Sequence, residues 1–332
     1  MSRKKEGSVS SHQTQRSLER PLGSTDAVIS GAPRVPQPGT SDRVTVRKAY
    51  KMLIGGAFVR SESGRYTQVA ETEKAPGASM ENVPLASRKD ARDAVVAARG
   101  AWEGWAGRTA YNRGQILYRL AEMLEARRAE LERGLERGGV SASEAEHEVV
   151  ATIDRAIAFA GWTDKYQSLF ASLNPTAGPH FTFTVPEPMG VVAIVAPTRP
   201  ALLGLAGSIL PVIASGNSCV VLASEADPRT AITFAEAIAT SDMPGGVVNI
   251  LTGKVSEVLP HLAKHMEVAA LDLHDVEAGL RKSVEEAAVG NVKRVRARAL
   301  DPVEWYDAAR AESPRWIERF VEMKTIWHPA GM

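Results

Sequence analysis

The only side chain in this sequence that could act as a thiolate nucleophile is Cys219, because the 332 residues include a single cysteine. It lies inside the apolar run Ser218 to Leu222, so we expect a small buried packing residue rather than a reactive thiol. His261 and His265 are four residues apart and would share one face of a helix, as paired metal ligands do. No third ligand accompanies them at metal-site spacing, which favours a solvated helix face. The sequence also lacks the nucleophile elbow of a hydrolase and the G-x-G-x-x-G motif.

Two buried strands and the helix between them organise the centre of the chain. Val191 to Ala196 is a β-branched apolar run of the kind found in parallel sheets, and prolines end it. Apolar residues then recur at helical spacing from Leu202 to Ile213, and Gly216-Asn217 offers a left-handed cap before the strand Ser218 to Leu222. A strand, a crossover helix and a parallel strand form a βαβ unit.

Two further strands, Val247 to Leu251 and Val268 to Leu273, alternate with helical patterns on the C-terminal side of this unit. Four such strands predict an α/β fold with an open parallel Rossmann-like sheet and flanking helices. The elements expected before the central unit are a β-hairpin and three helices: Met52 to Val59, Ser87 to Trp102, Ile116 to Leu135 and Ser143 to Leu169.

The composition is that of an ordinary globular protein, with 44% hydrophobic residues, 24% charged residues and a net charge of +1. This balance predicts neither a nucleic-acid nor a membrane partner, and no apolar run is long enough to span a membrane. Residues 1–45 are rich in Ser, Gly, Pro and Arg, which is typical of a disordered tail. The start has no secretory signal, and the single cysteine fits the reducing cytoplasm, where we expect the protein to reside.

Three motifs, EPMGVVAIVAPxxP, LPVIASGNSCVVLASE and MPGGVVNILTG, follow one another in an order that resembles the NAD(P)-dependent aldehyde dehydrogenase superfamily. The resemblance implies an NAD(P)-binding-like α/β domain over residues 46–172 and 188–300, with NAD or NADP as the cofactor. HFTFTV and FVEMKTIWHP resemble the family's oligomerisation strands, so residues 173–187 and 318–332 are expected to form a small β hairpin and a C-terminal strand. Residues 301–317 would then be a remnant linker in place of the catalytic domain, as in a truncated member.

The resemblance also implies which catalytic groups are missing. In the family a cysteine thiolate attacks the aldehyde, a glutamate activates the hydrolytic water, and an asparagine helps to hold the oxyanion. Arg199 stands at the asparagine position and Arg298 at the glutamate position. A cation cannot serve as a general base, and no cysteine stands at the nucleophile position, so no catalytic residue is expected.

The cofactor positions implied by the resemblance are degenerate. They are Ala196, Pro197, Ser224, Glu225 and Gly253. The lysine that reaches the adenosine ribose in the family's KPSE motif is absent from the matching segment LASE. Acidic residues, Asp275 and Glu277, stand at the helix start that would face the pyrophosphate and would repel it, so we expect NAD(P) binding to be weak or lost.

Three functional hypotheses follow from this pattern. The first is a catalytically deficient subunit, a pseudoenzyme, that forms a homo- or hetero-oligomer with a full-length aldehyde dehydrogenase. The second is an active oxidoreductase that converts an aldehyde to a carboxylic acid with NAD(P), alone or by completing a shared site. The third is a nucleotide-binding regulator. The missing Cys and Glu favour the first hypothesis over the second.

Overall fold

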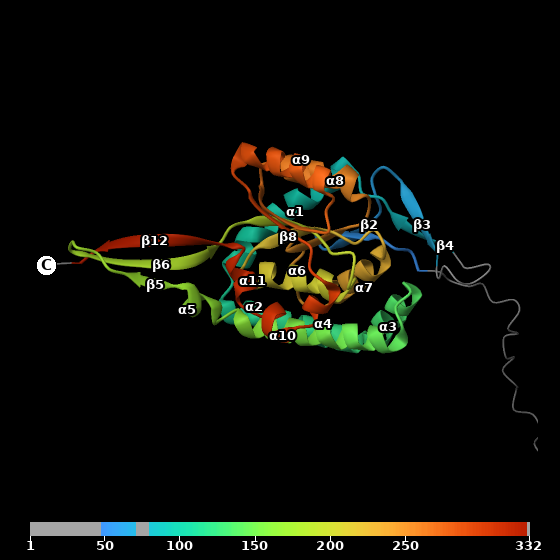
Figure 1. Cartoon of the computed structure of the whole chain (residues 1–332), viewed down its shortest axis with the longest axis horizontal. Coiled ribbons are helices and arrows are strands. Elements are labelled where there is room, and N and C mark those ends of the chain that lie inside the picture. The colour runs from blue at the N-terminus through green and yellow to red at the C-terminus, as the bar shows by residue number, and fades with distance from the viewer. Residues whose placement is uncertain (1–47, 71–79, 331–332) are drawn as a thin grey trace, which may run out of the picture. The chain divides into compact units, whose positions relative to one another are not determined.

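The computed structural model describes residues 48–70 and 80–330, so the expected tail at residues 1–45 lies outside the described residues. Its main feature is a seven-stranded sheet with the order β11-β10-β7-β8-β9-β1-β2 (Figure 1). The first five strands in this order are parallel, which confirms the predicted open α/β sheet. They are β7 (Val191–Val195), β8 (Ser218–Leu222), β9 (Val248–Leu251), β10 (Val268–His274) and β11 (Arg294–Arg298).

The predicted N-terminal hairpin extends this sheet at one edge. It consists of β1 (Met52–Ile54) and β2 (Ala57–Val59), and β1 pairs antiparallel with β9. A separate two-stranded hairpin is formed by β3 (Tyr66–Ala70) and β4 (Met80–Pro84). Gly245 and Gly56 are in close backbone contact where β2 approaches the loop before β9, and a Cβ at Gly56 would lie 2.8 Å from Gly245 Cα. This approach tolerates only glycine at both positions.

Helices cover both faces of the large sheet (Figure 1). One face packs against α1 (Arg88–Ala106), α8 (Val255–Lys264) and α9 (Ala278–Ala288). The other packs against α6 (Leu203–Ala214) and α7 (Pro228–Ala239), with α2 (Ala110–Ala126) and α4 (Ala142–Trp162) behind them. Successive strand residues alternate between the two apolar clusters, because side chains of a strand point to opposite faces of its sheet. Among the described residues, no helix is both long and apolar enough to cross a membrane.

Two of the predicted helices are each divided in the structure. The helix expected from Ile116 to Leu135 is interrupted at Arg127, whose φ of −105° and ψ of 10° lie outside the helical region, and α3 (Arg128–Arg137) follows. The helix expected to reach Leu169 ends at Trp162, and a separate α5 (Tyr166–Phe170) follows a short turn. Apolar periodicity continued across both breaks, so the pattern alone did not reveal them.

A second, three-stranded antiparallel sheet extends from the α/β body (Figure 1). We call it the β-arm; it contains β5 (Ser172–Asn174), β6 (His180–Pro188) and β12 (Val321–Pro329). Phe183 lies opposite both Leu173 and Ile326, so these three side chains share one face. Trp327 pairs with Thr182 and therefore lies on the opposite face. Thr182 and Thr184 are buried, whereas Phe181 is 53% exposed, so the more apolar side of β6 is the more open one.

The segment 301–317, expected as a linker, contains three short helices. They are η2 (Pro302–Trp305), α10 (Ala308–Ala311) and α11 (Arg315–Glu318), and they follow η1 (Val289–Asn291) and β11 along the chain. Trp305 and Ile317 are 1% and 0% exposed and join the main apolar cluster. The segment is therefore packed as part of the core.

Candidate functional site

The carboxyl ends of the parallel strands meet at one edge of the sheet, where ligands bind in open α/β proteins. β7 lies between β8 and β10, so the chain order reverses there, and the loops after β7 and β10 flank this switch point, where open α/β proteins have a ligand crevice. The expected cofactor residues all follow parallel strands of this sheet. Ala196 and Pro197 follow β7, Ser224 and Glu225 follow β8, and Gly253 follows β9. The fold thus brings the predicted positions to one edge.

A protein carboxylate bridges the two loops at the switch point between β7 and β10. Asp275 Oδ2 accepts a hydrogen bond from the backbone N–H of Thr198 at 2.9 Å. Thr198 belongs to the loop after β7, and Asp275 follows β10 with a positive φ of 54°. A carboxylate at this point places negative charge where the crevice would otherwise offer a backbone donor to an anion.

The starts of the helices that leave this edge are also occupied by carboxylates. Glu225 accepts from Val255 N at the start of α8 at 2.8 Å and from Lys254 Nζ at 2.7 Å. Glu277 is the N-cap of α9 and accepts from the backbone N–H groups of Gly279 and Leu280. These two bonds hold the pKa of the Glu277 carboxyl below its usual range. Both carboxylates accept hydrogen bonds from backbone N–H groups at a helix start, as a bound phosphate does in other proteins.

A third carboxylate, Glu148 of α4, occupies the start of α6. It is 3% exposed and accepts from Leu202 N at 2.6 Å and from Leu203 N at 3.1 Å. Burial raises the pKa of Glu148 and outweighs the opposite effect of the two backbone bonds. Sequence reasoning missed this residue, although it falls on the apolar stripe of its helix beside Ala145 and Val149. A charged residue on such a stripe was the available signal.

These carboxylates do not fit the pyrophosphate of a dinucleotide. Donors at the starts of α6, α8 and α9 and in the loop after β7 are already paired with Glu148, Glu225, Glu277 and Asp275. A pyrophosphate would have to displace an anion of the protein and then lie beside it, with like charges at short range. A group of three or more metal-binding side chains is likewise missing among the described residues.

Arg298, expected where the family has its general base, is held in an ion pair. Its Nη2 donates to both carboxylate oxygens of Asp272, one of them at 2.6 Å. Its guanidinium also lies 4.2 Å from the ring centre of Trp316. Asp272 is fully buried within β10, and sequence reasoning missed it, although an acid inside an apolar strand is an unusual pattern.

Asp272 also contacts a serine and histidine pair, but this group is not a catalytic triad. His274 Nε2 lies 3.2 Å from Asp272 Oδ2 and 3.2 Å from Ser208 Oγ, so one nitrogen faces both partners. A triad uses the two ring nitrogens separately, one for the acid and one for the nucleophile. All three side chains are at most 1% exposed, and the serine hydroxyl donates to Gly204 O. The group is a structural network without access to a substrate.

Arg199, expected at the oxyanion position, lines a cleft at this edge. The cleft has a volume of about 1090 Å³ and lies between the β3–β4 hairpin, the α3–α4 turn and the ends of β8 and β9. Arg199 Nη2 donates to Gly138 O at 3.2 Å, so its side chain extends toward the α3–α4 turn. Glu225 and Gly253 also line the cleft, whereas Ala196, Pro197 and Ser224 do not.

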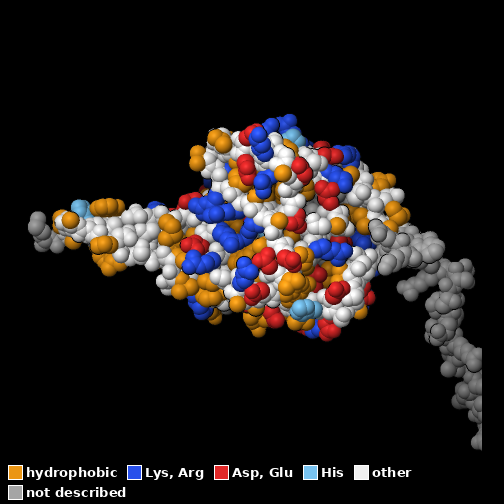
Figure 2. Space-filling model, in the orientation of Figure 1, with side chains coloured by type: hydrophobic (Ala, Val, Ile, Leu, Met, Phe, Trp, Pro, Cys, Tyr) orange, Lys and Arg blue, Asp and Glu red, His pale blue; other side chains and the backbone are white. Residues whose placement is uncertain are grey.

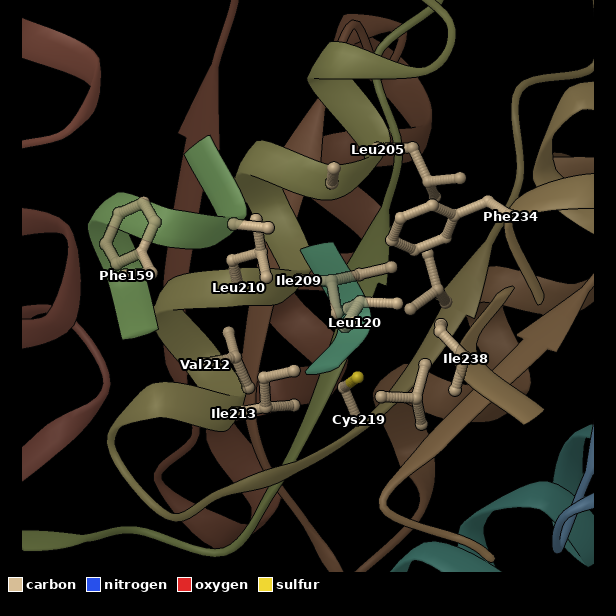
Figure 3. Packing of buried hydrophobic residues seen from close by; sticks show 14 of the residues in the cluster. Leu120, Phe159, Leu205, Ile209, Leu210, Val212, Ile213, Cys219, Phe234 and Ile238 are labelled. Carbon is tan, nitrogen blue, oxygen red and sulfur yellow. The ribbon is translucent and has the colours of Figure 1, made fainter. Parts of the chain in front are cut away.

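Cys219 is buried in the core, as expected. Figure 3 shows its sulfur among Ile213, Leu120 and Ile238, beneath α6. Burial raises the pKa of the Cys219 thiol far above its ordinary value and outweighs the opposite effect of a hydrogen bond with the backbone of Asn249. The thiol therefore stays protonated and has no route to the carboxyl edge of the sheet.

The segment 301–317 closes the side of this edge next to α4 and α6. Buried Arg155 of α4 donates to Trp305 O at 2.7 Å, and Trp162 Nε1 donates to Glu312 O at 2.8 Å. Trp305 lies against Gly207 of α6, where an added Cβ would come within 2.8 Å of the indole ring. These contacts fix the segment against α4 and α6.

The sheet, its crossover helices and the edge crevice define a Rossmann-like α/β protein. Residues 58–298 match the family model described as Aldehyde dehydrogenase family. The chain is 33% identical over 259 residues to cytosolic 10-formyltetrahydrofolate dehydrogenase of Mus musculus, covering 76% of this chain and 28% of that protein. It is 32% identical over 277 residues to aldehyde dehydrogenase, cytosolic 1, of Elephantulus edwardii, covering 80% and 52%.

Solved structures give the same result. The NAD+ complex of an aldehyde dehydrogenase from Bacillus cereus has a TM-score of 0.71 at 25% identity, covering 76% of this chain and 51% of that chain. HpcC from Thermus thermophilus has a TM-score of 0.70 at 25% identity, covering 76% and 48%. The chain belongs to the aldehyde dehydrogenase family. It spans about half or less of the length of these relatives.

Proposed function

We propose that this chain is a catalytically silent subunit that assembles with a complete aldehyde dehydrogenase. The observation that carries the proposal is the ion pair between Arg298 and buried Asp272, because it fixes a cation at the position where the family resemblance implies the general base. Cys219 supports it, since a fully buried, protonated thiol cannot attack an aldehyde. The single cysteine also fits a reducing compartment, and we place the subunit in the cytoplasm.

The cofactor site supports a silent subunit as well. Family members use NAD or NADP, and the relative from Bacillus cereus is described as an NAD+ complex. In this chain the helix starts at the carboxyl edge are occupied by Glu225, Glu277 and Glu148. We therefore propose that the family's cofactor binding is weak or lost here, which also argues against a nucleotide-binding regulator.

The β-arm supports the assembly part of the proposal. Leu173 and Phe181 are 68% and 53% exposed, and Trp327 on the opposite face is 63% exposed. Apolar side chains are visible along the β-arm in Figure 2. An open strand edge with exposed apolar side chains on both faces favours association with another chain. By family resemblance, that chain is a second subunit.

Co-purification tests the assembly directly. The tagged chain is expressed together with an untagged full-length aldehyde dehydrogenase encoded in the same organism, and the eluate is examined for the untagged protein. We expect the two to co-elute, and the Leu173→Lys/Phe181→Glu variant to lose the partner while keeping its circular dichroism spectrum. Val303→Lys is the matched control, because Val303 is 75% exposed but lies outside the β-arm. Absence of the partner from the wild-type eluate would contradict the proposed hetero-oligomer.

Activity of the chain alone tests the silent part. Reduced-cofactor absorbance is followed with NAD and NADP over a panel of aldehydes, and we expect no turnover. Turnover that disappears in Cys219→Ala would instead establish the alternative, an active oxidoreductase. The two experiments are independent, since a chain without turnover can still fail to bind a partner.

A further inference from the structure

A second groove, separate from the cleft that contains Arg199, lies between the start of α1 and the end of α8. Its volume is about 840 Å³, and it shares no lining residue with the cleft that contains Arg199. We call it the basic groove, because six of its lining residues are basic: Arg88, Lys89, Arg92, His261, Lys264 and His265. The two histidines are those that the sequence pattern placed on one helix face.

The positive charge in the basic groove is poorly neutralised. Glu62 is the one carboxylate among its lining residues, and it lies 3.6 Å from Lys89 Nζ and accepts from Ser87 Oγ. Arg92 pairs with Asp93. Within the described part of the chain, no carboxylate comes within ion-pair distance of Arg88 or Lys264.

The surroundings of His261 show the same excess of positive charge. Burial lowers the pKa of His261, and the charges of Arg88 and Lys264 lower it further. No carboxylate contributes to this shift. The three side chains come from two packed helices, so the fold holds like charges near one another across the groove. A bound anion would relieve this repulsion.

Two cations near the basic groove are paired with carboxylates outside it. Arg65 is paired with Glu257 on α8, and Arg99 of α1 is paired with Glu267. Glu257 lies on α8 and Arg99 on α1, so each of these pairs includes one residue of a helix that borders the basic groove. A long polyanion such as a nucleic acid would meet these pairs beyond the groove, whereas a small ligand would stay within it.

We propose that the basic groove binds a small anion that carries two or more phosphate groups. Arg88 and Arg92 are one helical turn apart on α1, and a guanidinium donates to phosphate oxygens in pairs. His261 and Lys264 offer a second row of donors on α8, so the two rows can hold separate phosphate groups of one ligand. The capped N–H groups of α1 take no part, because Ser87 and Asp90 already form a capping box there. This site does not depend on the proposed silent subunit or on its assembly.

Calorimetric titration of the full chain tests the proposal with tripolyphosphate as the probe and orthophosphate as the comparison. We expect tripolyphosphate to bind with a dissociation constant in the micromolar range, at least about tenfold more tightly than orthophosphate, and to weaken as salt is raised. The Arg88→Gln/Lys264→Gln variant should weaken binding by a further factor of at least about ten. Lys282→Gln on α9 is the matched control, because it removes an exposed cation outside the groove.

Several outcomes would overturn the inference. Equal affinity for the two anions would show nonspecific attraction, and unchanged binding by Arg88→Gln/Lys264→Gln would place the anion elsewhere. A single-stranded oligonucleotide that binds through these residues while tripolyphosphate does not would establish a nucleic-acid surface instead. Thermal unfolding of each variant without ligand shows that it is folded, so a loss of binding reports the groove itself.

Discussion

Arg298 Nη2 donates to both carboxylate oxygens of Asp272 across neighbouring parallel strands, and Asp272 is fully buried. Arg298 lies opposite His274 in the strand register, so its long side chain extends toward Asp272, two residues earlier in β10. Burial acts to raise the pKa of Asp272, but the charges and hydrogen bonds of His274 and Arg298 outweigh it and hold the pKa below its usual range. The pair therefore keeps a charged acid inside the sheet and keeps Arg298 from any other role.

The first prediction concerns the acid sensitivity that this pair creates. Because the folded-state pKa of Asp272 is depressed, its stabilisation is present above the unfolded pKa and is lost as pH falls through the folded value. Asp272→Asn leaves Arg298 without its partner and should lower the free energy of unfolding by about 3 kcal/mol at neutral pH. The difference from wild type should shrink below about pH 4.

Urea unfolding followed by tryptophan fluorescence at several pH values measures this difference. Glu318→Gln is the matched control, since it breaks the exposed Arg315–Glu318 pair and should change stability by less than about 1 kcal/mol. An Asp272→Asn protein as stable as wild type at neutral pH would show that the ion pair does not hold Arg298.

The second prediction concerns Cys219. Its thiol is 0% exposed and its pKa is raised by burial, so a thiol reagent should react with the native protein only through unfolding. In denaturant, we expect the reagent to label one thiol per chain. In buffer, we expect labelling to be no faster than global unfolding of the protein. Rapid labelling of the native protein would contradict the buried position and would reopen the question of a reactive thiol.

The continuous apolar runs of β7 to β10 predicted the sheet, because strands buried on both faces carry that pattern in their own residues. The partners of Arg199 and Arg298 could not be predicted in the same way. Arg298 meets Asp272 only because β10 and β11 are adjacent, and Glu148 reaches α6 only because α4 packs against it. Such contacts depend on tertiary packing, which local periodicity does not encode.

The third prediction concerns the cofactor. Asp275→Gly/Glu277→Ser removes two carboxylates from the edge of the crevice, and glycine suits the positive φ of 54° at residue 275. Serine retains a side-chain oxygen for the N-cap of α9. We expect wild type to bind NAD weakly or not at all, and the variant to bind at least about tenfold more tightly in calorimetry.

Asp275→Asn/Glu277→Gln is the companion variant, because it removes both charges and keeps the size of the side chains. Tighter binding by both variants would assign the effect to charge. Micromolar binding of NAD by the wild type would contradict the expectation that these carboxylates exclude the pyrophosphate.

The fourth prediction concerns Glu148, whose pKa shift has the opposite sign. Its pKa is raised above the ordinary 4.5 by burial, so the protonated form favours folding, and this contribution is lost as pH rises from about 4.5 through the folded value. Glu148→Gln stays neutral and can still accept a bond from Leu202 N. Relative to wild type, its free energy of unfolding should therefore increase as pH is raised through that window. Parallel pH profiles for the two proteins would contradict the raised pKa.

The last prediction concerns the β-arm and follows from its register. Nine residues of β12 pair with β6, but Phe320 and Val321 at its start belong to the buried core, and Asn217 Nδ2 donates to Phe320 O at 2.6 Å. Deletion of residues 319–332 would therefore damage the core as well as the β-arm. Deletion of residues 323–332 removes most of β12 and spares the core.

This shorter deletion, or Thr182→Pro in the central strand of the β-arm, should convert an oligomer to a less soluble monomer, because either change removes ladder hydrogen bonds. Light scattering gives the mass and circular dichroism shows that the α/β body remains. A soluble wild-type monomer whose mass and solubility do not change on deletion would refute assembly of this chain with itself through the β-arm.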